Sequence, residues 1–554
     1  MNLFDQIQQK FITQLDKLFS LEPAQKQHIL IEINDDAKKQ NFGDLSTNAA
    51  LIIAKAVGEN PRTVAQKIVE NFSDKAVERT EIAGPGFINF FLTQDALKTI
   101  ATQLFTQQET FFKLGPSAPK FVYNVEFVSA NPTGPLHLGH GRNGILGDVF
   151  GSILRFLGHN VTKEFYINDA GSQMQKLGLS LKVRCQQLLG QEAEIPEDGY
   201  QGEYLKEFAA QLLAEDTKNV EKRVAENDIE FFTAYARDHL LAQQKQTLDA
   251  YGIHFDVWFS EKTLHLDGSI EKALKLLEQK NYTYIEEGAL WFKSTAFGDD
   301  KDRVLKRSTG EVTYVAADVA YTQNKLARGA QKIIIVVGQD HHGYVERMKA
   351  VMQAFGHKAE DLDLLLYQLV TIKESGEAVR MSKRAGRIVS LADIIETVGA
   401  DVARFFYLHR KADAHLVFDL DLALKRTEEN PVYYIQYAYV RTKSMFEKAN
   451  EHAQLRDVSA ADITDLDEQE KLLLKKICAL KILLSNISHN YQTHLLTYYV
   501  VEVANLFHSF YGSHKVIDLE DVATSRKRLA LVMLVQKTLE LCMKLLGISC
   551  PEKM

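Results

Sequence analysis

The sequence predicts an α/β protein whose central domain has a doubly wound parallel sheet, with a helical insertion, an α+β domain before it and an all-helical domain after it. Three observations lead to this prediction. Residues 121–127 alternate apolar and polar side chains and then turn, through a Pro/Gly-rich break, into a helical pattern over 138–157. Residues 332–337 form an unbroken apolar run, which is typical of a parallel strand buried on both faces. Beyond about residue 395 the apolar periodicity is mostly helical.

Length and composition limit the class of protein. A chain of 554 residues has room for three or four domains of ~150 residues each. The formal net charge of -8 gives no global basic field, so any contact with RNA must be a local patch. The four cysteines form no Cys-x-x-Cys pair, which gives no support to a zinc ribbon or a disulfide framework and fits a reducing compartment. Because no apolar run reaches the ~18 residues of a membrane span, and the first helical pattern reads as a core helix, a cytoplasmic protein is expected.

The domain boundaries follow from changes in these patterns. Residues 1–112 combine turn-rich segments with helical and strand patterns and predict a small α+β domain. Residues 118–395 carry the parallel pattern, which long helical stretches interrupt at about 175–300, so an insertion is expected there. Residues 396–425 are expected to form linking helices, and residues 426–554 an all-helical domain.

Two imidazoles stand where the first strand of the central domain gives way to a helix. His137 and His140 flank Gly139, and Gly141 follows, so the turn lets a large ligand approach the backbone. The free amides and positive dipole of a helix N-terminus suit a polyphosphate. The alternative is a tight turn that the histidines merely cap, which is the preferred interpretation of an isolated His-x-x-His.

A polar cluster follows the apolar run 332–337. It contains Gln339, Asp340 and His342 between two glycines. Ligands of open α/β sheets bind outside the carboxyl ends of the strands, so this cluster is a candidate for a ligand site.

A carboxylate and a tyrosine lie four residues apart shortly before that strand. A short strand is expected at 311–315, and Asp318 follows Tyr314 at a spacing that places both on one helical face. From the residues alone, a helix N-cap explains Asp318 about as well as a ligand-binding role.

The run Arg380-Met381-Ser382-Lys383-Arg384-Ala385-Gly386-Arg387 concentrates positive charge. An exposed basic turn is the default interpretation of an isolated charge run. The alternative is a phosphate clamp, in which the compact ammonium of Lys383 follows a polyphosphate as charge develops.

Two of these motifs resemble signatures of one family. His137-Leu138-Gly139-His140 resembles the HIGH signature of class I aminoacyl-tRNA synthetases, with leucine in place of isoleucine, and the longer run 130–140 resembles the arginyl member. Met381-Ser382-Lys383 resembles the KMSKS loop of the same class, although arginines replace the first lysine and the final serine.

The resemblance covers the whole chain. It implies an α/β Rossmann-type catalytic domain with a connective insertion, an N-terminal α+β additional domain that packs on the corner of the tRNA, and a C-terminal all-α anticodon-binding domain. Tyr433, Tyr434, Tyr437 and Tyr439 lie at the start of that last domain. Tyrosines at helical spacing are more often core than base-stacking residues, so we expect some of them in the core and one or two facing RNA.

The activity implied is that of arginyl-tRNA synthetases, which form arginyl-adenylate and pyrophosphate from arginine and ATP and transfer the arginine to tRNA(Arg). The resemblance implies Mg²⁺ held mainly by ATP phosphates and water, no protein metal site, no zinc and no editing domain, and a monomer is expected. The implied catalytic residues are His137, His140 and Lys383; the ATP-binding residues are these three with Gly139, Gly141, Asp340, His342, Met381 and Ser382; the arginine-binding residues are Glu126, Ser129, Asn131, His137, Tyr314, Asp318 and Gln339.

Other functions stay open at this point. Another class I synthetase, or a related adenylate-forming ligase, would share the histidine motif, although the missing zinc cysteines disfavour the cysteinyl enzyme. A nucleotidylyltransferase that uses no RNA would leave the first 112 residues and the helical C-terminal part without a role. A non-catalytic RNA-binding relative is disfavoured by the intact His137, His140 and Lys383.

Overall fold

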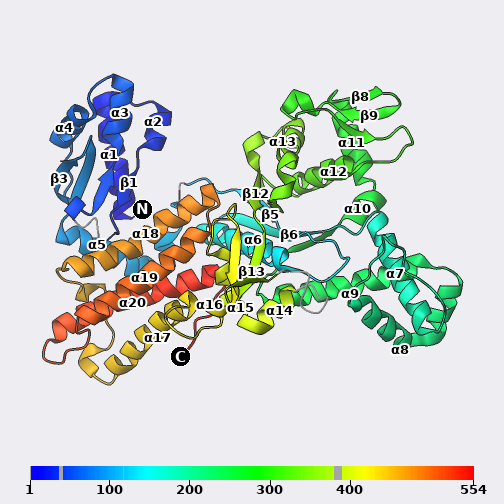
Figure 1. Ribbon diagram of the computed structural model, residues 1–554. Coiled ribbons are helices and arrows are strands. Elements are labelled where there is room, and N and C mark those ends of the chain that lie inside the picture. Colours follow the sequence, from blue (N-terminus) through cyan, green and yellow to red (C-terminus); the bar gives the residue numbers. More distant parts are fainter. Residues whose placement is uncertain (1, 37–40, 117, 380–389) are drawn as a thin grey trace.

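The computed structural model describes residues 2–36, 41–116, 118–379 and 390–554. Figure 1 shows a central α/β region with the N-terminal residues, in blue, on one side next to the orange and red C-terminal helices. The inserted residues, in cyan and green, extend to the opposite side of the central region (Figure 1).

The N-terminal region is a four-stranded antiparallel sheet covered by helices, as the α+β prediction requires. The strands lie in the order β1-β2-β4-β3. Its core includes Phe11, Phe72 and Phe90, whose rings pack edge to face with centroids 5.3–5.4 Å apart. The elements are α1 (Leu3–Phe19), α2 (Pro23–His28), β1 (Ile31–Ile33), β2 (Leu45–Thr47), α3 (Ala49–Val57), α4 (Pro61–Asn71), β3 (Val77–Ala83), β4 (Phe87–Leu92) and α5 (Gln94–Gln107), followed by the 3-10 turn η2 (Gln108–Phe112).

The central region is built on a five-stranded parallel sheet of order β12-β11-β5-β6-β7. From β5 the chain continues to β6 and β7 on one side, and β11 continues to β12 on the other. The crevice of this fold therefore opens between the carboxyl ends of β5 and β11, where ligands bind in doubly wound sheets. The strands are β5 (Val122–Glu126), β6 (Asn160–Ile167), β7 (Val257–Ser260), β11 (Lys332–Gly338) and β12 (Leu362–Tyr367), and α6 (Leu138–Leu157) connects β5 to β6.

The inserted part is not helical throughout. Three helices, α7 (Ser172–Leu188), α8 (Glu203–Ala225) and α9 (Ile229–Ala250), precede β7, which returns to the edge of the parallel sheet inside the interval expected as insertion. A second group then forms a small antiparallel sheet of order β10-β9-β8 with helices beside it. Its elements are α10 (Glu261–Leu266), α11 (Ser269–Gln279), β8 (Thr283–Glu286), β9 (Ala289–Phe292), η3 (Ser294–Phe297), β10 (Arg303–Lys306) and α12 (Tyr314–Ala327).

The strand expected at 311–315 is wrong. Thr313 is the N-cap of α12, and only Val312 makes an isolated bridge, to Lys306. The β-branched residues of this segment suggested a strand, but β propensity depends on context, and residues from Tyr314 onward belong to α12 instead.

After β11 the chain forms η4 (Gln339–Tyr344), α13 (Val345–Ala354) and η5 (Ala359–Asp361), and then a small sheet of order β14-β13-β15. The segment expected as linking helices therefore contains a strand, because β15 pairs in parallel with β13. The elements are β13 (Val370–Glu374), β14 (Glu377–Val379), α14 (Leu391–Val398), α15 (Ala400–Leu408), β15 (Leu416–Asp419) and α16 (Leu420–Ala423).

The C-terminal region is helical, as predicted. It consists of α17 (Pro431–Asn450), the turns η6 (Ala453–Leu455) and η7 (Ala460–Asp462), α18 (Glu468–Asn490), α19 (His494–Ser513) and α20 (Val522–Leu546). Within the described ranges, no helix is long and apolar enough to cross a membrane.

Buried charges join the regions. Arg404, on α15, is 1% exposed and donates to the carbonyls of Tyr251 and Leu546 and to the carboxylate of Asp148 on α6. Asp148 also accepts from Lys163 on β6, at 2.6 Å. One guanidinium thus ties the insertion and the last helix to the helix that begins at the two histidines.

Candidate active site

The two imidazoles cap the helix that follows them. His137 is the N-cap of α6, and its Nδ1 accepts from the backbone N–H of Gly139 at 3.1 Å. The Nδ1 of His140 accepts from the backbone N–H of His137 at 3.2 Å. The rings stack with centroids 3.7 Å apart. The capping alternative raised from the sequence is therefore realised, and it fixes the orientation of both rings.

This capping also determines where the ring protons lie. Because each Nδ1 accepts a backbone hydrogen, the neutral ring carries its proton on Nε2. Burial lowers the pKa of His137, and burial together with the adjacent imidazole lowers the pKa of His140 to about 3. Near neutral pH the pair is uncharged, so each ring offers one N–H donor without adding a positive charge. We name these two residues the imidazole corner.

The two glycines have different surroundings. A Cβ on Gly141 would lie 2.4 Å from the side chain of Leu391 and 3.1 Å from that of Tyr407, so this glycine lets α14 and α15 pack against α6. A Cβ on Gly139 would lie 3.0 Å from the ring of His137, so a side chain there would displace the capping imidazole. For Gly141 the geometry gives a packing role rather than an open face for a nucleotide.

The turn after β5 is strained and firmly held. Val128 and Ser129 have φ of 66° and 43°, in the left-handed region that β-branched residues in particular avoid. The backbone N–H of Val128 donates to the Asn143 side chain at 2.6 Å, and the hydroxyl of Ser129 donates to Glu126 at 3.1 Å. The second oxygen of that carboxylate accepts from the ammonium of Lys325 on α12.

The inserted helices hold the rest of the loop between β5 and α6. Gln244, on α9, donates its side-chain N–H to the carbonyls of Asn131 and Gly134, and Tyr204 on α8 donates to the carbonyl of Thr133 at 2.5 Å. The side chain of Asn131 donates to Gln173 at 2.8 Å. Asn131 therefore lies in the loop that leads from Glu126 to the imidazole corner, within reach of the insertion.

Asp318 lies among carboxylates, not at a helix start. It occupies the second turn of α12, so it is not the N-cap. Burial, with repulsion from Glu261 and Glu126, raises the pKa of Asp318 to about 7, although the Tyr344 hydroxyl donates to it and the guanidinium of Arg347 opposes the shift. We name Glu126, Glu261 and Asp318 the acidic pocket.

Glu261 is a site residue that the sequence analysis missed. It is buried, it accepts from the hydroxyl of Tyr166, and burial raises its pKa. It begins α10 immediately after β7 ends at Ser260. A carboxylate at the carboxyl end of the strand pattern near Trp258 was the signal that could have identified it.

A cavity of about 1520 Å³ opens beside the acidic pocket. Its lining includes Glu261, Tyr314 and Ala317, with residues of the insertion such as Gln175 and Thr233. The side chain of Tyr314 is 77% exposed at the start of α12, while Asp318 one turn later is half-buried. Tyr314 thus forms an exposed part of the lining of this cavity.

The expected residues of the second half are placed only in part. Gln339 is exposed at the start of η4, at the carboxyl end of β11. The side chains of Asp340 and His342 lie outside the described part of the chain, as do Met381, Ser382 and Lys383. Ser390, the first described residue after that interval, forms a bridge with His137.

Of the four tyrosines of α17, Tyr439 is buried, whereas Tyr433, Tyr434 and Tyr437 are half-buried, and the expectation that one or two of them face RNA stays a prediction. Tyr437 forms a cluster with residues of α19. The guanidinium of Arg441 lies 4.5 Å from the ring centre of Tyr437 and 5.0 Å from that of Tyr511, and His508 stacks on Tyr437. Stacked aromatic rings with an arginine suit unpaired bases.

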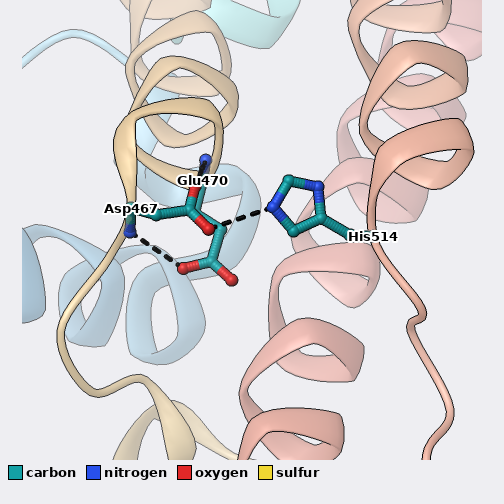
Figure 2. Close-up of side chains that lie close together, drawn as sticks. All are labelled: Asp467, Glu470 and His514. Carbon is teal, nitrogen blue, oxygen red and sulfur yellow. Dashed lines mark hydrogen bonds and ion pairs between the residues drawn. The ribbon is translucent and has the colours of Figure 1, made fainter.

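Among the residues that the structure describes, one other group has donor atoms close enough for a metal ion: Asp467, Glu470 and His514, whose ligand atoms lie within 4.8 Å of one another. Figure 2 shows these three side chains. Asp467 contacts the imidazole at 3.0 Å, and Glu470 is fully buried against Lys527 and Arg528. Lys527 and Arg528 pair with Glu470 and the imidazole of His514 contacts Asp467, so the cluster joins α18 to α19 and α20.

Family comparisons agree with this geometry in order and extent. Residues 5–92 match the arginyl tRNA synthetase N terminal domain, residues 102–408 match tRNA synthetases class I (R), catalytic domain, and residues 435–554 match the DALR anticodon binding domain. A parallel sheet with an imidazole corner, followed by this helical domain, defines a class I aminoacyl-tRNA synthetase.

Individual relatives narrow the assignment. An arginine–tRNA ligase of Oceanobacillus iheyensis is 40% identical over 558 residues, with 100% of both chains covered, and one of Citrifermentans bemidjiense is 43% identical over 515 residues, covering 92% of this chain and 93% of its own. A crystal structure described as an arginyl-tRNA synthetase from Campylobacter jejuni has a TM-score of 0.76 at 34% identity, over 84% of this chain and 100% of its own. The chain belongs to the arginyl-tRNA synthetase family.

Proposed function

We propose that the protein activates L-arginine with ATP and transfers it to tRNA(Arg) for protein synthesis. The observation that supports this proposal is that one loop, from Glu126 to His137, connects the acidic pocket to the imidazole corner. A cationic amino acid and a polyphosphate can then lie end to end across the crevice of the parallel sheet.

The imidazole corner would hold ATP. The two Nε2–H groups and the amino end of α6 offer uncharged donors to phosphate oxygens, and they stabilise negative charge as the α-phosphorus becomes five-coordinate. Magnesium would come with the triphosphate, held by phosphate oxygens and water. Lys383, with Met381 and Ser382, would neutralise the departing pyrophosphate, as the resemblance to the KMSKS loop implies.

The acidic pocket would hold arginine. Asp318 and Glu261 would accept hydrogen bonds from the planar guanidinium, and Tyr314 would close the entrance. Glu126, Ser129 and Asn131 lie on the side of the imidazole corner, where the α-ammonium and carboxylate of arginine must sit for that carboxylate to attack ATP. A smaller or apolar amino acid would leave these buried acceptors unpaired, which strongly disfavours it without an editing site.

The remaining regions would bind RNA. The cluster of Arg441, Tyr437 and Tyr511 would stack anticodon bases, and the N-terminal region would contact the corner of the tRNA. The enzyme would act as a monomer in the cytoplasm, where its tRNA is found.

The test is charging of total tRNA with each of the twenty amino acids in turn. Arginine alone should be attached, in a reaction that needs ATP and yields AMP and pyrophosphate. Charging of another amino acid at a similar rate would refute the substrate assignment. Arginine-dependent ATP turnover that survives digestion of all RNA would favour an enzyme that adenylates a small acid without tRNA.

A further inference from the structure

A buried lysine lies beneath the acidic pocket without facing the cavity. Lys325 is 2% exposed and stands two helical turns after Asp318 on α12, so the helix presents both residues on one side. Its ammonium contacts Glu126 and lies 4.3 Å from the ring centre of Tyr321. Burying a charged side chain costs free energy unless it is paired and hydrogen-bonded, so the contact with Glu126 matters for this lysine.

The carboxylate that Lys325 holds is also bound from the other side. Glu126 accepts the hydroxyl of Ser129 at 3.1 Å, and that hydroxyl oxygen accepts the backbone N–H of Tyr166 at 3.2 Å. Ser129 belongs to the strained turn that begins the loop to the imidazole corner. The ion pair therefore fixes a carboxylate and a hydroxyl in one geometry before any substrate arrives.

The charges around Glu126 make this lysine its main cationic partner. Asp318, on α12, repels it, whereas Glu164 on β6 pairs with Arg328 at 2.8 Å and is also attracted by the ammonium of Lys325. Without Lys325, the carboxylates of Glu126, Glu261 and Asp318 would lie together with less compensating positive charge. Arg347 is the cation that acts on Asp318. The other titratable groups facing this region include the hydroxyls of Tyr166, Tyr321 and Tyr344. At Glu261 they also include the imidazole of His265, at 3.7 Å, and the carboxylate of Asp169.

We propose that Lys325 is a positioning residue for arginine: its buried ammonium holds the ionised carboxylate of Glu126, together with Ser129, as a preformed acceptor pair for the α-ammonium of the substrate. This inference rests on the proposed function. Lys325 touches no substrate itself. The three carboxylates of the acidic pocket then have two roles. Glu126 is paired with Lys325 before the substrate binds, whereas Asp318 and Glu261 accept hydrogen bonds from the guanidinium of arginine.

A double-mutant cycle tests this division. The variants are Lys325→Met, Glu126→Gln and both together, and the measurements are kcat and the KM values for arginine and ATP in tRNA charging. Lys325→Met should raise the arginine KM about 30-fold and leave the ATP KM within about twofold. In the Glu126→Gln background the same change should cost less than about threefold, because no carboxylate remains to be held. Lys325→Arg, which keeps the charge, should recover most of the loss.

A matched control separates this effect from loss of an ion pair in general. Lys332→Met removes the partner of Asp361, at 2.7 Å, from the opposite end of β11, and it should leave the arginine KM unchanged. Equal costs of Lys325→Met in both backgrounds, or equal rises in the arginine and ATP KM values, would show a purely structural lysine and overturn the proposal.

The neutral double variant keeps the test usable if Lys325→Met does not fold. Should Lys325→Met fail to fold, the neutral pair Glu126→Gln/Lys325→Met must still fold, because it leaves no unpaired buried charge, and its arginine KM must match that of Glu126→Gln. A neutral pair much worse than Glu126→Gln would contradict the proposal. Failure of the proposed function would look different, since the wild-type protein would then charge no arginine at all.

Discussion

The imidazole corner and the acidic pocket are connected by the loop from Glu126 to His137, and under the proposed function they bind groups of opposite charge. Under the proposed function the corner would bind a polyanion through neutral groups, because burial lowers the pKa of both histidines. The pocket would bind a cation through carboxylates, one of which, Asp318, has a raised pKa. The comparison indicates two ways to bind a charged substrate. The polyphosphate of ATP would be bound by oriented, uncharged N–H donors. Arginine would be bound by carboxylates whose ionisation is unfavourable until the substrate is present.

The two regions are also preorganised in different ways. In the corner, each ring is fixed by capping its own helix, so the interactions are local in sequence. In the pocket, Glu126 from β5, Glu261 from α10 and Asp318 from α12 are brought together only by the tertiary structure. Substitutions in the corner should therefore lower the rate of the chemical step, and substitutions in the pocket should weaken the selection of arginine.

The largest effect is expected at Asp318. Asp318→Ala should lower arginine activation by at least about 1,000-fold, because it leaves a buried guanidinium without a main acceptor, while ATP binding persists. Pyrophosphate exchange that depends on arginine, with ATP binding measured separately, would check this. Normal exchange in the variant would remove Asp318 from the site.

The next largest effect is expected at the imidazole corner. His140→Ala removes one phosphate donor, so kcat should fall about 100-fold or more while the arginine KM changes by less than about threefold. Equal losses in both constants would mean that the ring only caps α6. The ring of His137 stacks on that of His140, so kcat and the arginine KM of His137→Ala should be measured alongside those of His140→Ala.

A third test concerns stability in the empty state. The pKa of Asp318 is about 7 in the folded protein against an ordinary 3.8, so the folded chain retains a proton that the unfolded chain releases. Stability from this group is complete below about pH 3.8 and is lost as the pH rises to about 7. Asp318→Asn should therefore be more stable than wild type by about 2 kcal/mol at pH 8 in denaturant titrations, after allowance for partial exposure, with the difference shrinking towards pH 4. Equal stability at pH 8 would contradict the raised pKa.

The smallest effect is expected in the cluster of Arg441, Tyr437 and Tyr511, for which we propose a role in binding anticodon bases. Arg441→Ala removes the guanidinium between Tyr437 and Tyr511 and should raise the tRNA KM about tenfold without changing the arginine KM. Lys537→Ala, an exposed cation on α20, is the matched control and should leave both unchanged. A change in the arginine KM would mean that the cluster acts on the pocket.

Local patterns predicted the parts of the fold that local physics decides. The helix start at His137 and Leu138, the buried strand β11 and the end of α20 at Gly547 were readable because capping, burial on both faces and a left-handed C-cap each leave a mark in adjacent residues. The strand expected at 311–315 failed because Thr313 caps α12, a role its β-branched neighbours concealed.

The missed site residues depend on contacts between distant parts of the chain. Lys325 meets Glu126 across 199 positions, and Glu261 acts through Tyr166 and Asp318, so no window of sequence contains either interaction. The packing role of Gly141 was hidden for the same reason, since Leu391 and Tyr407 come from α14 and α15. The placement of Lys383 lies outside the described residues, and its role stays a prediction.

The pH dependence of the two KM values tests the central claim most directly. Because Asp318 must be ionised to bind arginine and has a pKa of about 7, the arginine KM should fall as the pH rises from about 6 to about 8, approaching tenfold per unit at the acidic end. The ATP KM should change much less over the same range, because burial lowers the pKa of both imidazoles of the corner and favours their neutral forms. An arginine KM that does not change with pH, or an ATP KM that changes as steeply, would contradict the contrast between a neutral corner and a charged pocket.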